Sequence, residues 1–169
     1  AVDTIRSKQK PDFAVMLGTG LDGLADKIRI ERVVPYSQIP HFAVPTAPGH
    51  KGELVLGMLE RRRIVAFRGR LHYYEGFTLE QITFPVRVAR ALGAKALIVS
   101  NAAGGLNPLF EKGDIMLVDD HVNLMGTNPL LGPNDDGLGP RFPDMAEPYD
   151  QAFLELAEKV AVGAGIRLK

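Results

Sequence analysis

The chain has 169 residues, of which 46% are apolar and 24% charged, and its twenty basic side chains balance its twenty acidic ones. This is the composition of a soluble globular protein with one core, and the zero net charge excludes a global field that would steer it to nucleic acid or an anionic membrane. The lack of cysteine excludes disulfides and thiolate chemistry, no apolar run approaches the roughly 20 residues of a membrane span, and no secretory signal is recognisable, so we expect a cytoplasmic protein.

The first strong signal is the apolar run Phe13–Leu17, which follows a short amphipathic helix expected within residues 1–8. Continuous apolarity predicts a strand buried on both faces, as in a parallel sheet. The turn Gly18-Thr19-Gly20 comes next, and a short helix is predicted over Leu21–Ile28. The backbone N–H groups at the start of that helix, together with the Thr19 hydroxyl, favour an anion at the turn.

A dinucleotide-binding fold is an alternative, because the residues from Gly18 to Gly23 match G-x-G-x-x-G. Three features disfavour it. The helix is short, the next apolar segment Val33–Tyr36 contains a proline, and no acidic residue ends a second strand about 20 residues on, where a ribose would need one. A nicotinamide or flavin site is therefore disfavoured.

Residues 35–52 contain four prolines and two glycines and are predicted to form a loop. His50 lies next to Gly49 in this loop, where a backbone can approach a ligand closely. A simply solvated histidine is the alternative. We interpret His41 and His121 as structural.

Two apolar runs, Glu53–Leu59 and Arg63–Phe67, predict an antiparallel hairpin. Arg70, His72 and Tyr74 follow it at alternate positions, so in an extended segment they would share one side. A guanidinium fork, a titratable ring and an aromatic wall in one row favour a site for an anion beside a flat or sugar-like group. A strand end with solvated charges and tyrosines packed on a core is the alternative.

A capping-box pattern at Thr78 predicts the start of a helix that ends at Gly93, and Pro85 inside it should cause a kink or mark a second start. Residues 94–100 then predict a buried strand. The small residues of Asn101–Gly105 allow the main chain to approach a ligand at the carboxyl edge of the sheet. A tight turn that needs small side chains is the alternative.

The last third of the chain gives fewer regular signals. Asp114–Val118 is strand-like, and residues 121–149 form a long aperiodic segment of the kind that serves a function or an interface. Glu147–Val162 predicts a helix, and Ile166–Lys169 predicts the opening of another strand.

Taken in order, five segments resemble the trimeric class of purine nucleoside phosphorylases, from about residue 5 to the end of the chain. These segments are Leu17–Leu21, Pro48–His50, Gly69–Gly76, Ser100–Pro108 and Asn128–Pro143. The elements and the resemblance together predict an α/β fold with a mixed, largely parallel central sheet flanked by helices. They also predict a single domain over residues 1–169 that is the N-terminal part of a longer phosphorylase domain.

The resemblance implies phosphorolysis, in which phosphate attacks the anomeric carbon of a purine ribo- or deoxyribonucleoside and releases free base and the sugar 1-phosphate. It implies inorganic phosphate as co-substrate, and no cofactor or metal. Phosphate would be bound by Thr19, His50, Arg70, His72 and the backbone N–H of Ala102. Arg70 and His72 would also be the catalytic residues.

The resemblance further implies that Tyr74 lies along the ribose and that Phe142 reaches into a neighbouring subunit's site, so the expected assembly is a homotrimer acting in purine salvage. Two departures stand out. Thr19 replaces the usual serine, and the family continues well beyond Lys169 with the residues that hold the purine. We therefore expect these 169 residues alone to bind phosphate weakly, to associate and to be a poor phosphorylase.

Two other functions stay open. A methylthioadenosine phosphorylase-like enzyme shares the Gly-Thr-Gly turn, although Asn101–Gly105 and the Arg-x-His-Tyr-Tyr pattern favour the purine nucleoside enzyme. A non-catalytic module that binds phosphate or a sugar phosphate is the other alternative.

Overall fold

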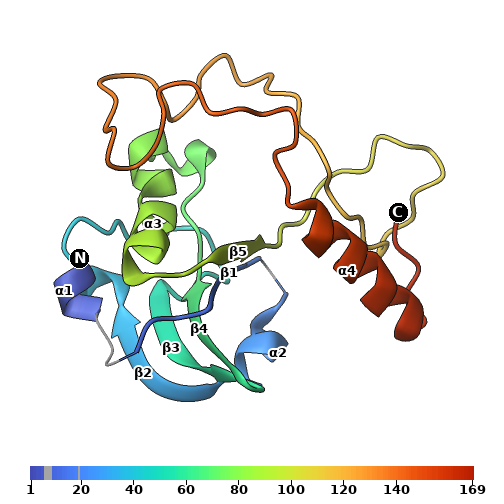
Figure 1. Ribbon diagram of the computed structural model, residues 1–169, viewed down its shortest axis with the longest axis horizontal. Coiled ribbons are helices and arrows are strands. Elements are labelled where there is room, and N and C mark those ends of the chain that lie inside the picture. Colours follow the sequence, from blue (N-terminus) through green and yellow to red (C-terminus); the bar gives the residue numbers. More distant parts are fainter. Residues whose placement is uncertain (6–8, 19) are drawn as a thin grey trace. The chain divides into compact units, whose positions relative to one another are not determined.

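A computed structural model describes residues 1–5, 9–18 and 20–169. The chain forms two compact units, residues 1–102 and residues 103–169. Figure 1 shows the first as a sheet with helices and the second as a long irregular segment with one helix. The single domain over residues 1–169 stays a prediction.

The first unit is built on a five-stranded sheet with the order β2-β3-β4-β1-β5 (Figure 1). The strands are β1 (Phe13–Leu17), β2 (Arg29–Pro35), β3 (Glu53–Leu59), β4 (Arg62–Arg68) and β5 (Ala96–Val99). β1 pairs in parallel with β4 and β5, whereas β3 pairs antiparallel with β2 and β4. The mixed α/β sheet is confirmed, but among the described strands it is evenly mixed rather than largely parallel.

The antiparallel half has two sources. One is the β3–β4 hairpin, which the apolar runs predicted to within one residue. The other is β2, which the sequence pattern did not identify, because only Val34 of its seven residues is buried and Pro35 ends it. A charged, bulged edge strand of this kind carries no alternating signal. Since β2 pairs with β3 and not with β1, the G-x-G-x-x-G match does not open a dinucleotide fold.

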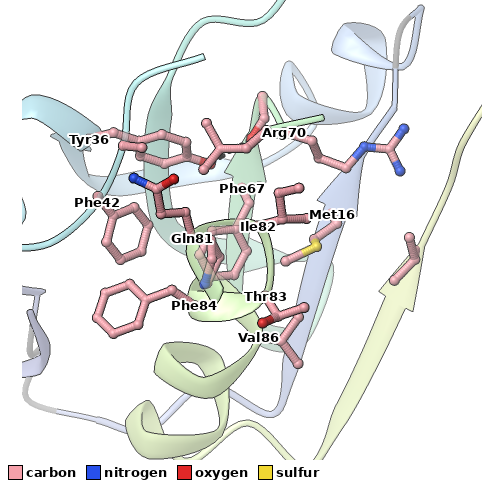
Figure 2. A pocket seen from close by; sticks show the side chains of 15 residues that line it. Met16, Tyr36, Phe42, Phe67, Arg70, Gln81, Ile82, Thr83, Phe84 and Val86 are labelled. Atoms are coloured by element: carbon pink, nitrogen blue, oxygen red, sulfur yellow. Dashed lines mark hydrogen bonds between the residues drawn. The ribbon is translucent and has the colours of Figure 1, made fainter. Parts of the chain in front are cut away.

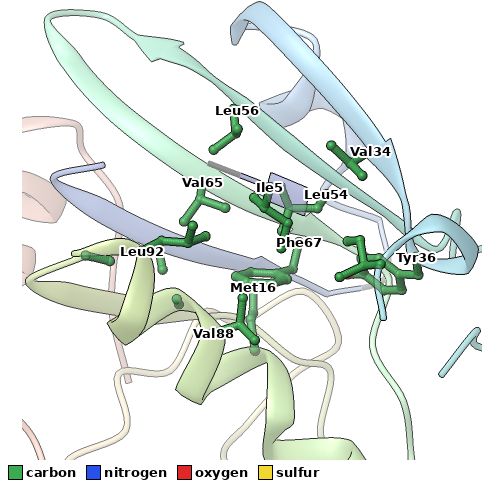
Figure 3. Packing of buried hydrophobic residues seen from close by; sticks show 14 residues of the cluster. Ile5, Met16, Val34, Tyr36, Leu54, Leu56, Val65, Phe67, Val88 and Leu92 are labelled. Atoms are coloured by element: carbon green, nitrogen blue, oxygen red, sulfur yellow. The ribbon is translucent and has the colours of Figure 1, made fainter. Parts of the chain in front are cut away.

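β1 is buried on both faces, as predicted. Ala14 and Met16 belong to a core cluster on one face of the sheet, and Val15 and Leu17 belong to a cluster on the other. Figure 3 shows Met16 packed between Phe67 of β4 and Val88 of the long helix. Each such large apolar side chain contributes roughly 1.5–3 kcal/mol through burial, which explains the unbroken apolar run.

β5 corrects an expectation. The sequence predicts a buried strand over residues 94–100, yet Leu97, Ile98 and Val99 are exposed. β5 pairs on one side only, with β1, so it is an edge of the described sheet. Continuous apolarity alone does not tell a central strand from an edge strand whose apolar faces lie open.

The structure has four helices in the described part of the chain, none long and apolar enough to cross a membrane. They are α1 (Val2–Ile5), α2 (Asp22–Ala25), α3 (Leu79–Leu92) and α4 (Gln151–Gly163). α2 covers less than predicted, since it runs from Asp22 to Ala25 rather than from Leu21 to Ile28. α1 lies within the predicted residues 1–8, of which residues 6–8 lie outside the described residues. A helix of one turn has few backbone hydrogen bonds to offset the free-energy cost of its nucleation.

α3 begins and ends where its capping residues predict. Thr78 Oγ1 accepts from the Gln81 N–H at 3.3 Å, the Gln81 side chain accepts from the Thr78 N–H at 2.9 Å, and Gly93 has φ +102°. Pro85 lies inside one continuous helix and does not begin a second one. The buried residues Val88 and Leu92 hold this helix against the sheet.

The second unit is largely irregular, as its composition predicts. The two strand-like runs meet each other, since Lys169 N–H donates to Ile115 at 2.9 Å and Leu117 N–H donates to Lys169 at 3.1 Å. They form an isolated parallel bridge rather than full strands. α4 begins at Gln151, later than the predicted Glu147, because Asp150 caps it by accepting from the Phe153 N–H.

Candidate functional site

Three strands of the first unit end at one edge of the sheet. β4, β1 and β5 are neighbours and parallel, with Leu17 in register with Arg68 and Met16 in register with Val99. The segments that follow them, beginning at Gly18, Gly69 and Ser100, therefore leave the sheet side by side. Open α/β sheets bind ligands at this carboxyl edge.

The first of these segments approaches the third closely. The Gly18 N–H donates to Ser100 Oγ at 2.9 Å, and the Ser100 N–H donates to the Met16 carbonyl at 3.1 Å. A Cβ atom at position 18 would lie 2.6 Å from the Ser100 carbonyl oxygen. Glycine is thus required where the turn crosses the end of β5. The sequence pattern gave Ser100 no role, although a hydroxyl directly after a parallel strand is a usable signal.

We expect Gly18→Ala to lower the free energy of unfolding by about 1–3 kcal/mol, because the added methyl must push two backbone segments apart. The matched control is Gly23→Ala, since a Cβ at Gly23 meets no atom within 4 Å. Denaturant unfolding of both variants measures the difference. Equal stability of the two would contradict a close approach at Gly18.

The second segment turns back at once to meet the proline-rich loop. Gly69 has φ +117°, and a Cβ there would lie 2.9 Å from the Gly52 nitrogen. The Gly52 N–H donates to the Arg68 carbonyl at 2.8 Å, and the Arg70 N–H donates to His50 Nδ1 at 3.1 Å. Because Nδ1 of His50 accepts, its neutral imidazole carries the proton on Nε2 and can offer it as a donor.

Arg70 is a cation with incomplete solvation. Its Nε is buried, and no described residue accepts a hydrogen bond from it. No acidic side chain in the described part of the chain forms an ion pair with it either. Burial lowers the pKa of the Arg70 guanidinium, but arginine stays protonated in proteins. An anion beside it would relieve the cost of holding that charge.

Arg70 lines a cavity of about 230 Å³. Its walls are mostly apolar and include Met16, Phe42 and Phe84. Figure 2 shows the guanidinium of Arg70 extending away from Phe42 and Phe84. The stem of Arg70 thus packs on the core while its charged end leaves the cavity.

The predicted extended row holds as far as His72, whose backbone is extended, but Tyr74 departs from it because Tyr73–Glu75 forms a 3-10 turn, η2. The rings of His72 and Tyr74 nevertheless meet. The His72 ring stacks on Tyr74 at 4.8 Å between centroids and meets the His50 ring edge-on at 4.9 Å. Tyr74 is 78% exposed, so this row of three rings ends in an open aromatic face.

Glu75 organises this cluster, and the sequence pattern did not assign it a role. One carboxylate oxygen accepts from the His72 N–H at 2.9 Å and from His72 Nδ1 at 2.6 Å. The other accepts from Thr46 N and Oγ1, both at 2.6 Å, and from Ala47 N at 2.9 Å. A glutamate three residues after a histidine that precedes a turn is the signal that could have identified it.

These hydrogen bonds set the charge of Glu75. Burial alone would raise its pKa, but the hydrogen bonds from Thr46 and His72 outweigh burial and lower the pKa to about 2. The group is therefore an acceptor-only carboxylate at neutral pH, and Nδ1 of His72 must donate to it. The two histidines therefore differ at Nδ1. Nδ1 of His50 carries no proton because it accepts a hydrogen bond, whereas Nδ1 of His72 carries the proton that it donates to Glu75.

The geometry can be compared with known proteins. Residues 12–169 match the model of the Phosphorylase superfamily. The chain belongs to this superfamily. It is 52% identical over 159 residues to purine nucleoside phosphorylase 1 of Geobacillus stearothermophilus, covering 94% of this chain and 58% of that protein. It is also 51% identical over 154 residues to the purine nucleoside phosphorylase of Bos taurus. That match covers 89% of this chain and 53% of the bovine protein.

A solved phosphorylase structure has the same fold. Isoform 2 of purine nucleoside phosphorylase from Schistosoma mansoni, in complex with cytosine and ribose-1-phosphate, matches with a TM-score of 0.91 and 41% identity. The match covers 99% of this chain and 62% of that one. The nucleoside phosphorylase-like α/β fold is therefore confirmed, and the chain spans little more than half the length of the relatives it matches.

Within this phosphorylase chain, the described residues bring His50, Arg70, His72 and Tyr74 together by direct contacts. Ala102 is exposed three residues after β5, and its carbonyl accepts from the Asn101 side chain at 3.2 Å. Thr19 lies outside the described residues. Phe142 belongs to the second unit, where its ring is 87% exposed.

The side chains of this cluster mainly offer hydrogen-bond donors. Arg70 and His50 offer N–H groups, and the only carboxylate described in the cluster, that of Glu75, already accepts five hydrogen bonds. No group of three or more histidine, aspartate or glutamate side chains in the described residues could hold a metal ion. Such an arrangement favours an anionic ligand.

Proposed function

We propose that the whole protein is a purine nucleoside phosphorylase, a pentosyltransferase that cleaves purine ribo- and deoxyribonucleosides with phosphate. The observation that carries this proposal is Arg70 at the carboxyl edge of the sheet, a cation with a buried Nε that no described residue satisfies. Its backbone N–H donates to His50, whose ring meets that of His72. The identity of 52% to a named purine nucleoside phosphorylase supports it.

Phosphate would be bound by the Arg70 guanidinium, Nε2–H of His50, the His72 ring, the Thr19 hydroxyl and the backbone N–H of Ala102. Each charge-assisted hydrogen bond to phosphate contributes about 1.5–3 kcal/mol. A phosphate oxygen forms a bond to the anomeric carbon as the bond from that carbon to the purine nitrogen breaks, and the base departs with the electron pair. Arg70 and His72 would be catalytic because they hold the nucleophile and its negative charge against the developing ribosyl cation.

Tyr74 would bind the nucleoside. Its exposed face continues the ring row beyond His72 and offers a surface along which the ribose would lie. The Schistosoma mansoni relative was crystallised with ribose-1-phosphate, the product that this reaction would give. The proposed reaction uses inorganic phosphate as co-substrate and no cofactor, and the proposed setting is the cytoplasm.

The test is the release of hypoxanthine from inosine by the whole protein as the phosphate concentration is varied. We expect the rate to saturate with phosphate and to fall to background without it. Cleavage of methylthioadenosine in preference to inosine would favour the methylthioadenosine phosphorylase-like alternative. Binding of phosphate or ribose 1-phosphate without any turnover would favour a non-catalytic module. Either result would overturn the proposal.

We propose a homotrimer in which Phe142 of one subunit completes the nucleoside site of the next. Its exposed ring in a long aperiodic segment supports this arrangement. Co-expression of Phe142→Ala and Arg70→Ala subunits should then restore activity, because at equal amounts about a quarter of the sites would combine an intact Arg70 with an intact Phe142. Each variant expressed alone is the control. Activities that merely add at every mixing ratio would contradict a shared site.

A further inference from the structure

We infer that Tyr36 is a positioning residue for the anion site, because its hydroxyl holds the peptide group between Gly69 and Arg70 in the orientation that makes His50 a donor through Nε2. The inference rests on the proposed function only for the identity of the anion, which is phosphate. The hydrogen bonds themselves belong to the structure.

One peptide group joins Tyr36 to His50. The Tyr36 hydroxyl donates to the Gly69 carbonyl at 2.8 Å, and the N–H of the same peptide group, on Arg70, donates to His50 Nδ1 at 3.1 Å. A trans peptide is planar, with its C=O and N–H pointing in opposite directions. The hydroxyl therefore fixes the direction of the N–H that His50 accepts.

This peptide group needs such a restraint. Gly69 has φ +117° and no Cβ. Glycine has the least restricted backbone dihedral angles of any residue, so Gly69 itself does little to stop the Gly69–Arg70 peptide group from rotating. A rotated peptide would leave the Gly69 carbonyl without its donor and His50 without the N–H that fixes its tautomer. With the hydroxyl in place, rotation breaks two hydrogen bonds at once.

Tyr36 is itself held rigidly. Its side chain is 1% exposed, and its ring packs on Phe42 at 5.1 Å between centroids. Its backbone N–H donates to the Gly52 carbonyl at 2.8 Å, and Gly52 in turn donates to Arg68 at the end of β4. Burial and the nearby Glu53 both raise the pKa of the Tyr36 hydroxyl, so it stays protonated and remains a donor.

Tyr36→Phe removes only the hydroxyl oxygen and tests the inference. We expect the KM and Kd for phosphate to rise about tenfold, as for the loss of one restraining hydrogen bond, while the KM for nucleoside changes little. Hydrogen exchange at the Arg70 amide should become faster. Val65→Ala is the control, because Val65 lies fully buried in the same core cluster and loses volume without touching this peptide.

A double-mutant cycle with His50→Ala separates positioning from mere stabilisation. If Tyr36 acts through His50, Tyr36→Phe should have no further effect on phosphate Kd once His50 is gone. Additive effects, or an equal loss of phosphate affinity in Val65→Ala, would overturn the inference. A wild-type protein that binds phosphate but cleaves no nucleoside would overturn the proposed function and not this inference, because phosphate Kd and Arg70 amide exchange still report it.

Discussion

Replacement of Arg70 by alanine is expected to raise the KM for phosphate by about 10- to 150-fold, the equivalent of one charge-assisted hydrogen bond. The KM for nucleoside should rise much less. Arg70 carries a positive charge, and among the described residues its buried Nε has no hydrogen-bond partner and its guanidinium forms no ion pair. A bound phosphate would supply the missing partner. Initial rates at varied phosphate and saturating nucleoside measure the effect.

Two further variants make this test specific. Arg70→Lys keeps the positive charge and loses the planar fork, so its phosphate KM should lie between those of wild type and Arg70→Ala. Arg61→Ala removes an exposed arginine from the turn of the β3–β4 hairpin and should leave the phosphate KM unchanged. Equal increases in the KM values for phosphate and nucleoside would contradict the assignment of Arg70 to phosphate.

The second large effect is expected for Glu75→Gln. Glutamine keeps the shape of glutamate, but one of its two acceptor oxygens is replaced by an NH₂ group. That group is a donor, so it cannot accept the hydrogen bonds that the surrounding N–H and O–H groups donate to Glu75. We expect the free energy of unfolding at neutral pH to fall by about 1–3 kcal/mol. The phosphate KM should also rise, because the variant no longer fixes the His72 ring or the Thr46–Ala47 segment that leads to His50.

The pH dependence of this effect has a defined sign. The pKa of Glu75 is about 2 in the folded protein, below its ordinary value of 4.5. The carboxylate therefore contributes its full stability above about pH 5 and loses it as the pH falls from there through about 2. The stability difference between wild type and Glu75→Gln should shrink over that range in denaturant unfolding. A difference that stays constant from pH 7 down to pH 3 would contradict the role of the carboxylate.

The parts of the fold that the sequence predicted are those with local signals. β1 was predicted from its unbroken apolarity, the β3–β4 hairpin from two apolar runs, and α3 from Thr78 and Gly93 at its ends. β2 was not predicted, because an edge strand with one buried residue has no periodic pattern. The open faces of β5 depend on which strands lie beside it, which a single segment does not encode.

The candidate site divides in the same way. The sequence indicated three residues of an anion site, namely His50, Arg70 and His72, because cationic or titratable side chains stand close to glycines there. The roles of Glu75 and Tyr36 were not indicated, since each depends on a contact with a segment about 30 residues away in the chain. The predicted row of Arg70, His72 and Tyr74 was wrong beyond His72, where the backbone turns at η2, although the rings of His72 and Tyr74 still stack.

The most direct test of phosphorolysis at this site is the fate of phosphate itself. The whole protein is incubated with inosine and inorganic phosphate and followed by ³¹P NMR, with Arg70→Ala alongside. Our account predicts that a sugar 1-phosphate signal grows in step with the release of hypoxanthine, and that this growth is strongly reduced in Arg70→Ala at limiting phosphate. Release of hypoxanthine with free ribose and an unchanged phosphate signal would contradict it.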